Sequence, residues 1–400
     1  MAGPGHQSAA RTPLRVRRLL AAALVPFVLA TAVGLAVLWP ARQRHRPARS
    51  FGTPAQLVNG TVASVDTHPC PAGGGRCSTV FARVTSGADR GHPAILPDLA
   101  LGPGVPLLHE GDRIVLGRTV DPTNGHVDYY FADYQRRFPL VLLAVLFAVL
   151  VVGVARWRGL AALVGMGVTL LVLVRFVIPA TLEGESPVAI ALVGSAAIIF
   201  VVVYVAHGLS ARTTTALLGT LGGLGLTAAL AAIFVAATHL TGLSSEDITS
   251  LQSAVGNVSL QGLMLAGVVI GSLGVLNDVT VTQASAVWEI HEANPTRAFA
   301  DLYRSGMRVG RDHIASTVYT LVLAYAGASL PLLILFSVSN QKVTNILTGD
   351  LVGQEIVRTL VGSLGLVASV PLTTVLAVLV VRGSARAGET ATTVPGDARA

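Results

Sequence analysis

Long uninterrupted apolar runs dominate the pattern of hydrophobic and polar positions along this chain. They are close to the length of about 20 residues at which an α-helix crosses the hydrocarbon core of a bilayer. The pattern predicts eight such spans, at residues 19–39, 138–155, 159–180, 187–206, 214–240, 259–288, 313–337 and 356–381. Because a signal peptide has an apolar core of only about 7 to 15 residues, we interpret the first run as an uncleaved anchor.

Residues 51–137 follow a different pattern. Short runs of β-type composition alternate there with segments rich in glycine and proline, which is typical of strands separated by turns. The expected strands are residues 56–65, 78–85, 113–120 and 127–134. The chain is therefore expected to carry a small extracytoplasmic β domain inserted after the first helix.

The β domain also holds the only two cysteines, Cys70 and Cys77, on either side of a glycine run. A disulfide between them fits an oxidising compartment. A metal site formed with the nearby His68 is the weaker alternative, because three ligands would leave a four-ligand site incomplete.

Composition agrees with the hydropathy pattern. Hydrophobic residues make up 52% of the 400 residues and charged residues only 12%, about half the roughly 25% that is usual in soluble domains. The expected fold class is a polytopic α-helical membrane protein with about eight transmembrane helices. The net charge of +7 comes from arginines that flank apolar spans, where they set orientation, so nucleic acid is not an expected partner.

Charge in the connecting segments predicts the orientation. Arginines concentrate after the second, fourth, sixth and eighth spans, and acidic residues occupy the alternate loops. The positive-inside rule then places both termini in the cytoplasm and the β domain outside. The expected domains are a disordered cytoplasmic head at 1–18, the anchor at 19–39, the β domain at 51–137, a seven-helix membrane domain at 138–381 and a disordered cytoplasmic tail at 382–400.

Asn277 and Asp278 stand deep inside the sixth span. A carboxylate at that depth is costly unless it faces protein or water, and such residues often mark ion or substrate pathways. Small and polar residues recur around it every three or four positions and share one helical face. They are Gly267, Gly271, Gly274, Asp278, Thr282, Ser285 and Glu289. A buried Asp278 that merely braces the helices through a Thr or Tyr is the structural alternative.

Further candidates lie where the seventh span begins. Arg311 and Asp312 are expected at its N-terminal end, where the helix dipole favours the carboxylate. A contact from Arg311 to Asp278 or Glu289 would place a charge at the inner end of a path. Ser316 and Tyr319 carry hydroxyls on the inner half of the same span. We predict that these two line the same face as the carboxylate.

A resemblance to a known family rests on this same part of the chain. The motifs are Ser305-Gly306, Gly310-Arg311-Asp312, the segment TLVLAYAGASLPL at 320–332 and the glycine-rich segment GSLGVLNDVTVTQAS at 271–285. Together they resemble the YibE/YibF-like family of bacterial multi-pass membrane proteins, over most of residues 51–381. The resemblance implies a multi-pass protein of the bacterial plasma membrane, with no established reaction.

The chain contains no HExxH, GxSxG or Walker motif, so neither an enzyme nor a cofactor or metal requirement is expected. Our leading hypothesis is a secondary transporter or exporter of an unidentified solute that uses Asp278 as a proton- or cation-binding carboxylate. The alternative is a membrane scaffold or accessory subunit whose outer β domain binds a partner. The expected partners are the lipid bilayer and either a second copy of the chain or another membrane protein.

Overall fold

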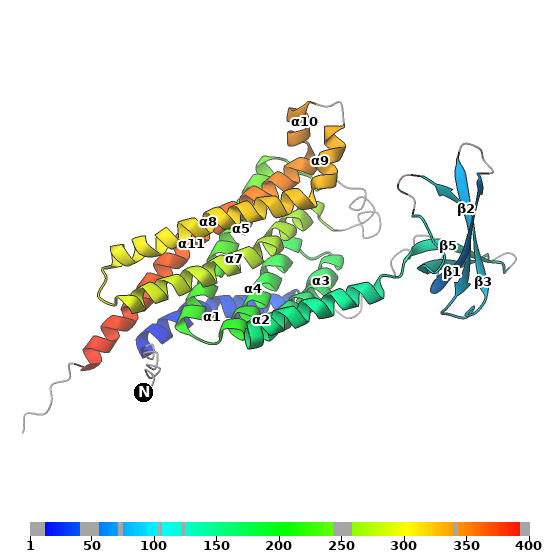
Figure 1. Cartoon of the computed structure of the whole chain (residues 1–400). Helices are drawn as coiled ribbons and strands as arrows, with labels where there is room; N and C mark the ends of the chain where they lie inside the picture. The colour runs from blue at the N-terminus through cyan, green and yellow to red at the C-terminus, as the bar shows by residue number, and fades with distance from the viewer. Residues whose placement is uncertain are drawn as a thin grey trace, which may run out of the picture. The chain divides into compact units, whose positions relative to one another are not determined.

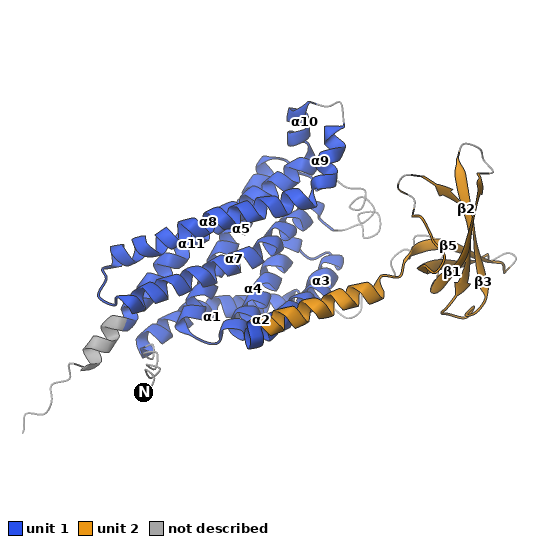
Figure 2. Ribbon diagram, in the orientation of Figure 1, with its two compact units in different colours: residues 1–45, 155–400 blue, residues 46–154 orange. Residues whose placement is uncertain are grey.

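The computed structural model describes residues 13–40, 56–70, 75–102, 104, 106–121, 125–242, 258–338 and 342–392. The chain divides into two compact units, one of residues 1–45 and 155–400 and one of residues 46–154 (Figure 2). Residues 1–12 of the predicted head and 393–400 of the predicted tail lie outside the described residues.

The unit of residues 46–154 is built on one five-stranded antiparallel sheet. Its strands are β1 (Gln56–Pro69), β2 (Arg76–Val84), β3 (Pro93–Leu101), β4 (Arg113–Val120) and β5 (Val127–Tyr134), in the order β3-β2-β1-β4-β5. Val62, Val80, Ile114 and Leu116 are buried at its core. A small β domain after the first helix is confirmed.

Strand β3 is the one the sequence pattern did not predict. Its two prolines, Pro93 and Pro97, indicate a turn segment, because proline cannot donate to a strand ladder. In the structure β3 pairs only with β2 and forms an edge of the sheet. Prolines are tolerated at an edge, since one side of the strand needs no ladder donors.

Cys70 and Cys77 are joined by a disulfide, with their Cα atoms 4.9 Å apart. The bond closes the hairpin between β1 and β2, whose last paired residues are Pro69 and Arg76. No free cysteine is left in the chain.

The other unit is helical (Figure 1). Its helices, with α2 running in from the β unit, are α1 (Leu14–Val37), α2 (Arg137–Val172), the π-helical η1 (Leu173–Val177), α3 (Ile178–Leu182), α4 (Pro187–His207), α5 (Ala211–Ala237), α7 (Leu260–Ala293), α8 (Phe299–Ala328), α9 (Leu330–Ser337), α10 (Val343–Thr348) and α11 (Asp350–Thr392). Helices α1 and α11 both extend into segments predicted to be disordered. No strong helix breaker interrupts the chain there, so the helices continue.

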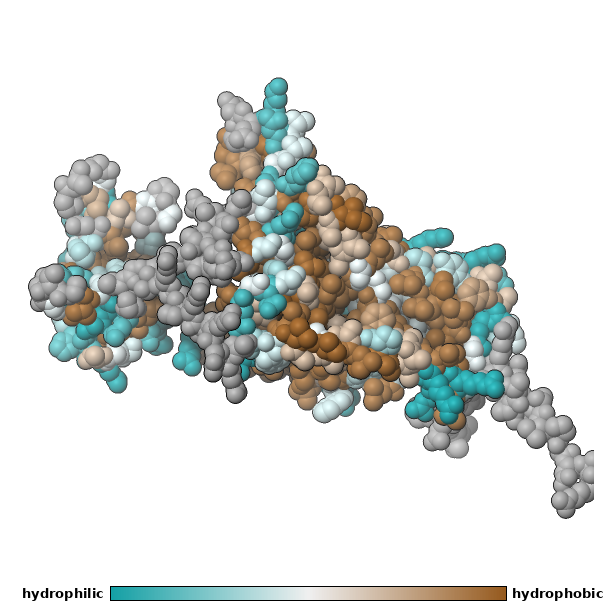
Figure 3. Space-filling view, turned by 180° about the vertical axis from the view of Figure 1, so that it is seen from behind, coloured by the Kyte–Doolittle hydropathy of each residue, from teal (hydrophilic) through white to brown (hydrophobic). Residues whose placement is uncertain are grey.

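Six of the described helical segments are long and apolar enough to cross a membrane, and α8 with α9, bent by 62°, would make a seventh. One of the six, Arg137–Leu182, covers two of the predicted spans. Its backbone breaks at Arg156, where φ is 54° and ψ is −128°. Hydrophobic residues cover most of the visible face of the helical unit (Figure 3), as expected for helices that face hydrocarbon.

The centre of the helical unit is the packing of α4, α5, α7 and α11. Small residues bring α5 and α11 close together: a Cβ at Gly365 would overlap the Thr227 hydroxyl. The hydroxyls of Thr220 on α5 and Thr280 on α7 lie 2.6 Å apart and are fully buried. The apolar core around them includes Ile198, Leu217, Leu224, Val269, Leu276, Val279, Leu366 and Val370.

Helix α8 differs from the predicted seventh span at both ends. It begins at Phe299, so the charged link is already helical and Asp312 lies in the helix interior rather than at its N-terminal end. The expected position of Asp312 at the N-terminal end of the helix is therefore wrong, because no breaker separates the amphipathic link from the apolar segment. At the other end Ser329 terminates α8, and Pro331 stands in the first turn of α9.

Candidate functional site

The candidate site lies along α7 and α8, which run side by side with α11 (Figure 1). Helix α7 buries one face against α4, α5 and α11, and its apolar residues alternate with small ones on that face. Helix α8 packs mainly through its first half, where Leu302, Gly306 and Gly310 are buried. Beyond Gly310 most of its residues are exposed.

A buried amide fixes this packing. The side chain of Gln283 on α7 donates through Nε2 to the carbonyl oxygen of Gly306 on α8 at 2.9 Å and to Oγ1 of Thr374 on α11 at 2.7 Å. Gln283 is only 3% exposed, so each hydrogen bond satisfies a group that water cannot reach. One side chain thus ties three helices together.

The glycines of α8 explain how the helices approach so closely. A Cβ at Gly310 would come 2.5 Å from Cγ1 of Val370 and 2.9 Å from Oε1 of Gln283, and one at Gly306 would come 3.0 Å from Cγ2 of Thr374. A larger residue at Gly310 would therefore crowd Gln283 and Val370, and one at Gly306 would crowd Thr374. Both glycines belong to the motifs that carry the family resemblance, so part of that motif serves helix packing.

Asp278 occupies the opposite face of α7, close to the midpoint of the helix. Its side chain is 70% exposed on the surface of the unit, and its Oδ2 lies 3.9 Å from Nε2 of His313 on α8. The structural alternative, a buried Asp278 braced by a Thr or Tyr, is therefore wrong. In a bilayer this carboxylate would face the lipid hydrocarbon unless another protein surface covered it.

Two more polar atoms beside the carboxylate make no hydrogen bond to a described residue. Oδ1 of Asn277 and Nε2 of His313 are buried atoms that make no hydrogen bond within the described part of the chain. A buried polar atom without a partner costs roughly 1 to 3 kcal/mol, and such atoms are uncommon in native structures. Asn277, Asp278 and His313 therefore form a polar cluster whose hydrogen-bonding capacity is not used by the fold.

The predicted polar face of α7 exists and points outward. All its members except the half-buried Ser285 are exposed. From Gly267 to Glu289 it advances 22 residues along the helix, which correspond to about 33 Å. The expected face is therefore as long as a bilayer core is thick, and it does not lie in the interior of the bundle.

Polar side chains of other helices accompany this face. Near one end, Nη1 of Arg358 on α11 donates to Oε1 of Glu355 at 2.8 Å, and a Cβ at Gly267 would meet the same guanidinium at 3.9 Å. The Tyr325 hydroxyl lies against Gly271, 3.1 Å from where a Cβ would be. At the other end, Oε1 of Glu289 is 3.7 Å from Nη1 of Arg212. Polar groups thus recur along the whole length of α7.

The remaining predicted residues lie on the exposed half of α8. Arg311, Asp312, Ser316 and Tyr319 are all exposed, Tyr319 to 67%. Among the residues that the structure describes, no ion pair joins Arg311 to Asp278 or to Glu289, which approach His313 and Arg212 instead. No group of three or more His, Cys, Asp or Glu side chains suited to a metal is found among the described residues.

His313, Gln283 and Arg358 were missed by sequence reasoning. His313 is the first residue of the predicted span 313–337 and directly follows Arg311 and Asp312, and the sequence analysis assigned it no role. Gln283 is a single amide in an otherwise small and apolar stretch, and a buried amide with three helices around it cannot be recognised from its neighbours in sequence. A signal was present for His313, because a titratable residue one span away from Asp278 is a natural partner for it.

In the β unit, in contrast to the polar cluster on α7, a carboxylate is hydrogen-bonded to its neighbours. Oδ2 of Asp89 accepts hydrogen bonds from Nε of Arg118 at 2.5 Å and from the Tyr129 hydroxyl at 2.7 Å. The Arg118 hydrogen bond, followed by that from Tyr129, lowers the pKa of Asp89 below its ordinary value of 3.8. Arg118 and Tyr129 are direct cross-strand partners on β4 and β5. This cluster locks the turn between β2 and β3 onto the sheet.

The architecture defines a class: a multi-helix protein with several apolar, span-length helices and a small β unit inserted after the first. The family model described as YibE/F-like protein matches residues 143–383, which is more than half of the chain, so this chain belongs to the YibE/F-like family. The match covers the helical part from within α2 onward and leaves the β-sheet outside, although the resemblance was expected from residue 51. Neither a curated protein nor a solved structure matches the chain.

Proposed function

We propose that this protein is a secondary transporter or exporter of an unidentified solute in the bacterial plasma membrane. The observation that carries the proposal is the cluster of Asn277, Asp278 and His313 at mid-height of α7. A carboxylate with an adjacent imidazole at 3.9 Å can take up and release a proton or a cation. The unpartnered Oδ1 of Asn277 is a further ligand atom for such an ion.

The proposed topology has eight spans with both termini in the cytoplasm and the β unit outside. If α8 and α9 form one broken span, seven segments are long enough. The segment Arg137–Leu182, with 46 residues, would be about 69 Å long as one helix, more than twice the bilayer core. The break at Arg156 supports dividing it into two spans. The arginines of the connecting segments support the orientation.

The polar groups along α7 support a route past the carboxylate. Glu355, Arg358 and Tyr325 lie on the half of α7 nearer its outer end in this topology, and Arg212 with Glu289 at its inner end. Asp278 and His313 lie between them. A solute or ion that moves along this face would meet polar side chains throughout, with an arginine–glutamate pair near each end.

This face requires a cover in a membrane, because an exposed carboxylate is costly in hydrocarbon. We propose that a second copy of the chain provides it. Since Cys70 and Cys77 are bonded to each other, Gly274→Cys would introduce the only free thiol of the chain on this face. Thiol-specific cross-linking in membranes should then yield covalent dimers, whereas Gly225→Cys on α5 should not. Equal yields from both variants would contradict the assembly.

The test of the transport proposal compares Asp278→Asn with Asp301→Asn. Asp301 is an exposed residue of α8 that pairs with Arg304 at 3.3 Å, so its variant makes the same chemical change outside the cluster. Cells lacking the gene would be complemented with each variant at equal membrane abundance, and their ion and metabolite contents measured. We expect wild type and Asp301→Asn to restore a solute level and Asp278→Asn to fail while it inserts and folds normally.

The same experiment distinguishes a transporter from a scaffold. The scaffold alternative is favoured by one observation: the β sheet belongs to a compact unit of its own. If Asp278→Asn restores the cell as well as wild type does, the carboxylate has no role in flux. Deleting residues 56–134 then becomes the informative change. A scaffold that binds its partner through the β unit loses all function on this deletion, and a transporter core retains part of its flux.

A further inference from the structure

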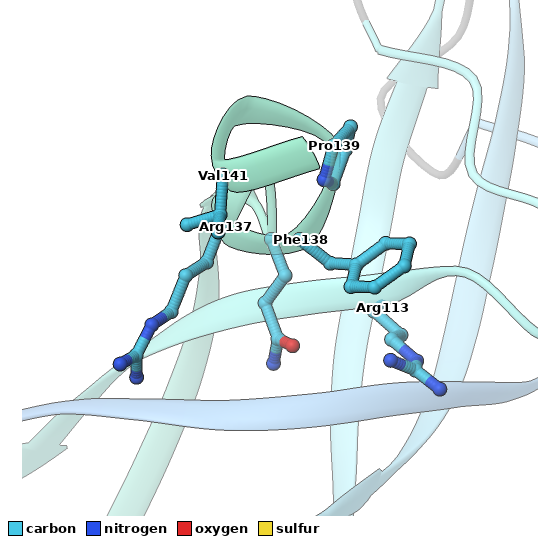
Figure 4. Close-up of a pocket in the computed structure, with 6 residues that line it drawn as sticks. Arg113, Arg137, Phe138, Pro139 and Val141 are labelled. Carbon is cyan, nitrogen blue, oxygen red and sulfur yellow. The ribbon is translucent and has the colours of Figure 1, made fainter. Parts of the chain in front are cut away.

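The β unit contains a cavity of about 460 Å³ where the sheet meets the first turn of α2. Its lining combines cationic and apolar side chains: Arg113, Gln135, Arg137, Phe138, Pro139 and Val141. The two arginines come from different elements, β4 and α2 (Figure 4). All six residues belong to the unit of residues 46–154.

Both arginines of the cavity are available to a ligand. No carboxylate pairs with Arg113 or Arg137 in the part of this unit that the structure describes. Their neighbour Arg136 is different: its Nη1 lies 2.6 Å from both oxygens of Asp133, and its guanidinium stands over the Tyr134 ring at 5.8 Å. The protein therefore neutralises one of three neighbouring arginines and leaves the charge of the other two unbalanced.

The sheet holds the floor of the cavity in place. The backbone N–H of Gln135 donates to the carbonyl oxygen of Arg113 at 2.8 Å, and Nε2 of Gln135 donates to the carbonyl oxygen of Ile114 at 3.1 Å. Arg113 is thereby fixed beside the start of α2. Figure 4 shows the Arg113 side chain close to the Phe138 ring and the Arg137 side chain across the view from it. Two guanidiniums that line one cavity suit a phosphate, whose oxygens accept several hydrogen bonds at once.

The other wall of the cavity begins a strongly apolar helix. Phe138 is 72% exposed and Val141 54% exposed, and the apolar run continues along α2 as a candidate span. Charged donors at the end of such a run stand at the level of lipid headgroups, and aromatic rings prefer the same level. The cavity thus places cationic groups, which can bind a phosphate headgroup, next to an apolar surface, which can contact an acyl chain.

We propose that this cavity binds the phosphate headgroup of an anionic membrane lipid. Arg113 and Arg137 hold the phosphate, and Phe138 and Val141 contact the first segment of an acyl chain. The proposal rests on α2 crossing the membrane, as proposed above, and is independent of transport through α7. Its function would be to anchor the β unit at the membrane surface next to its helix.

The test uses the purified full chain in detergent and measures lipid binding by native mass spectrometry. Phosphatidylglycerol is titrated against phosphatidylcholine, with wild type, Arg113→Gln, Arg137→Gln and Arg136→Gln. Arg136→Gln is the matched control, because it removes the same charge one residue away. We expect the first two variants to bind phosphatidylglycerol about tenfold more weakly, as for the loss of a charge-assisted hydrogen bond, and the control to bind it as wild type does.

Three results would overturn the proposal. Equal losses in Arg136→Gln and Arg137→Gln would mean that general surface charge attracts the lipid. Unchanged binding in both Arg113→Gln and Arg137→Gln would place any lipid elsewhere. A second arm adds inorganic phosphate to the lipid titration: efficient displacement of phosphatidylglycerol by inorganic phosphate would identify a free-anion site. Hydrogen exchange of the β4 and β5 amides checks that each variant keeps the fold of the sheet.

Discussion

The two faces of α7 treat polar groups in opposite ways. On the inner face, Gln283 and Thr280 are buried and hydrogen-bonded to neighbouring helices. On the outer face, Asp278 is exposed, and the adjacent Asn277 and His313 keep buried polar atoms without hydrogen bonds in the described structure. The polar groups on the inner face hold the helices of the bundle together. The outer groups contribute nothing comparable to the fold, and this is why we assign function to them.

The largest expected effect comes from breaking the packed side. Gly365→Val places a branched side chain against Thr227, where even a Cβ does not fit. Overpacking of this kind costs about 1 to 3 kcal/mol, and more where the backbones must separate. We expect the loss of monodisperse protein after detergent extraction, or a strongly lowered melting temperature.

Gly225→Val is the control for this change. Gly225 lies on α5, and a Cβ added there meets no described atom within 4 Å. The same substitution should leave thermal unfolding nearly unchanged. If both variants unfold at the same temperature, the destabilisation comes from placing valine in a helix. The proposed difference between packed and open sides would then be contradicted.

The next effect concerns the buried amide. Gln283→Leu removes both hydrogen bonds of Nε2 and leaves the Gly306 carbonyl and the Thr374 hydroxyl without that donor. The loss of a hydrogen bond costs about 0.5 to 1.5 kcal/mol, so the loss of both should appear as a lower melting temperature of the purified chain. Thr282→Val, the adjacent residue on the exposed face, should change stability little. An unchanged melting temperature for Gln283→Leu would show that Gln283 does not hold the three helices together.

Much of the fold was predictable because hydrocarbon-length runs dictate helices. Helices α4, α5 and α7 begin and end within a few residues of the predicted spans. The breaks were predictable only in part. The break at Arg156 falls between the predicted spans 138–155 and 159–180, but the one at Ser329 divides the predicted span 313–337, and Pro371 lies within α11 without ending it. A helix break depends on packing and on local backbone conformation, so residue type alone decides it poorly.

The candidate site was predicted in part. Helical periodicity correctly groups Asp278 with Thr282 and the glycines on one face of α7, but periodicity cannot say whether a face points inward. Small residues usually mark packed faces, but here they occur on both faces of α7, since Ala266, Ser272 and Ala284 are buried on the packed face with Gln283. His313 reaches Asp278 only because α8 is continuous through Asp312, and that continuity is a property of the folded chain.

A third prediction tests whether His313 belongs to the cluster. His313→Gln keeps a polar side chain of similar size but removes the titratable imidazole near Asp278. Once the transported solute is known, we expect the flux to fall by about tenfold, less than the 10²–10⁴-fold typical of a principal proton-transfer group, because the 3.9 Å contact is long. Thermal unfolding should stay unchanged. Wild-type flux in this variant would leave Asp278 as the only titratable group of the proposed site.

The smallest effect is expected in the β unit, where the charges are paired as on the inner face of α7. Because hydrogen bonds from Arg118 and Tyr129 lower the pKa of Asp89 in the folded state, the ionised carboxylate stabilises the fold. That contribution is complete above the ordinary pKa of about 3.8 and is lost as the pH falls through the lowered value. Asp89→Asn should therefore increase hydrogen exchange of the β4 and β5 amides at neutral pH.

Exchange rates corrected for the intrinsic effect of pH provide the measurement, with Asp128→Asn as control. Asp128 is an exposed carboxylate of β5, so its replacement should leave exchange nearly unchanged. As the pH falls through the lowered pKa of Asp89, wild type and Asp89→Asn should converge, since protonation of Asp89 removes the charge that the substitution removes. If the difference between them persisted in acid, the loss would come from altered packing of the turn, and the ion pair would not be what holds the turn on the sheet.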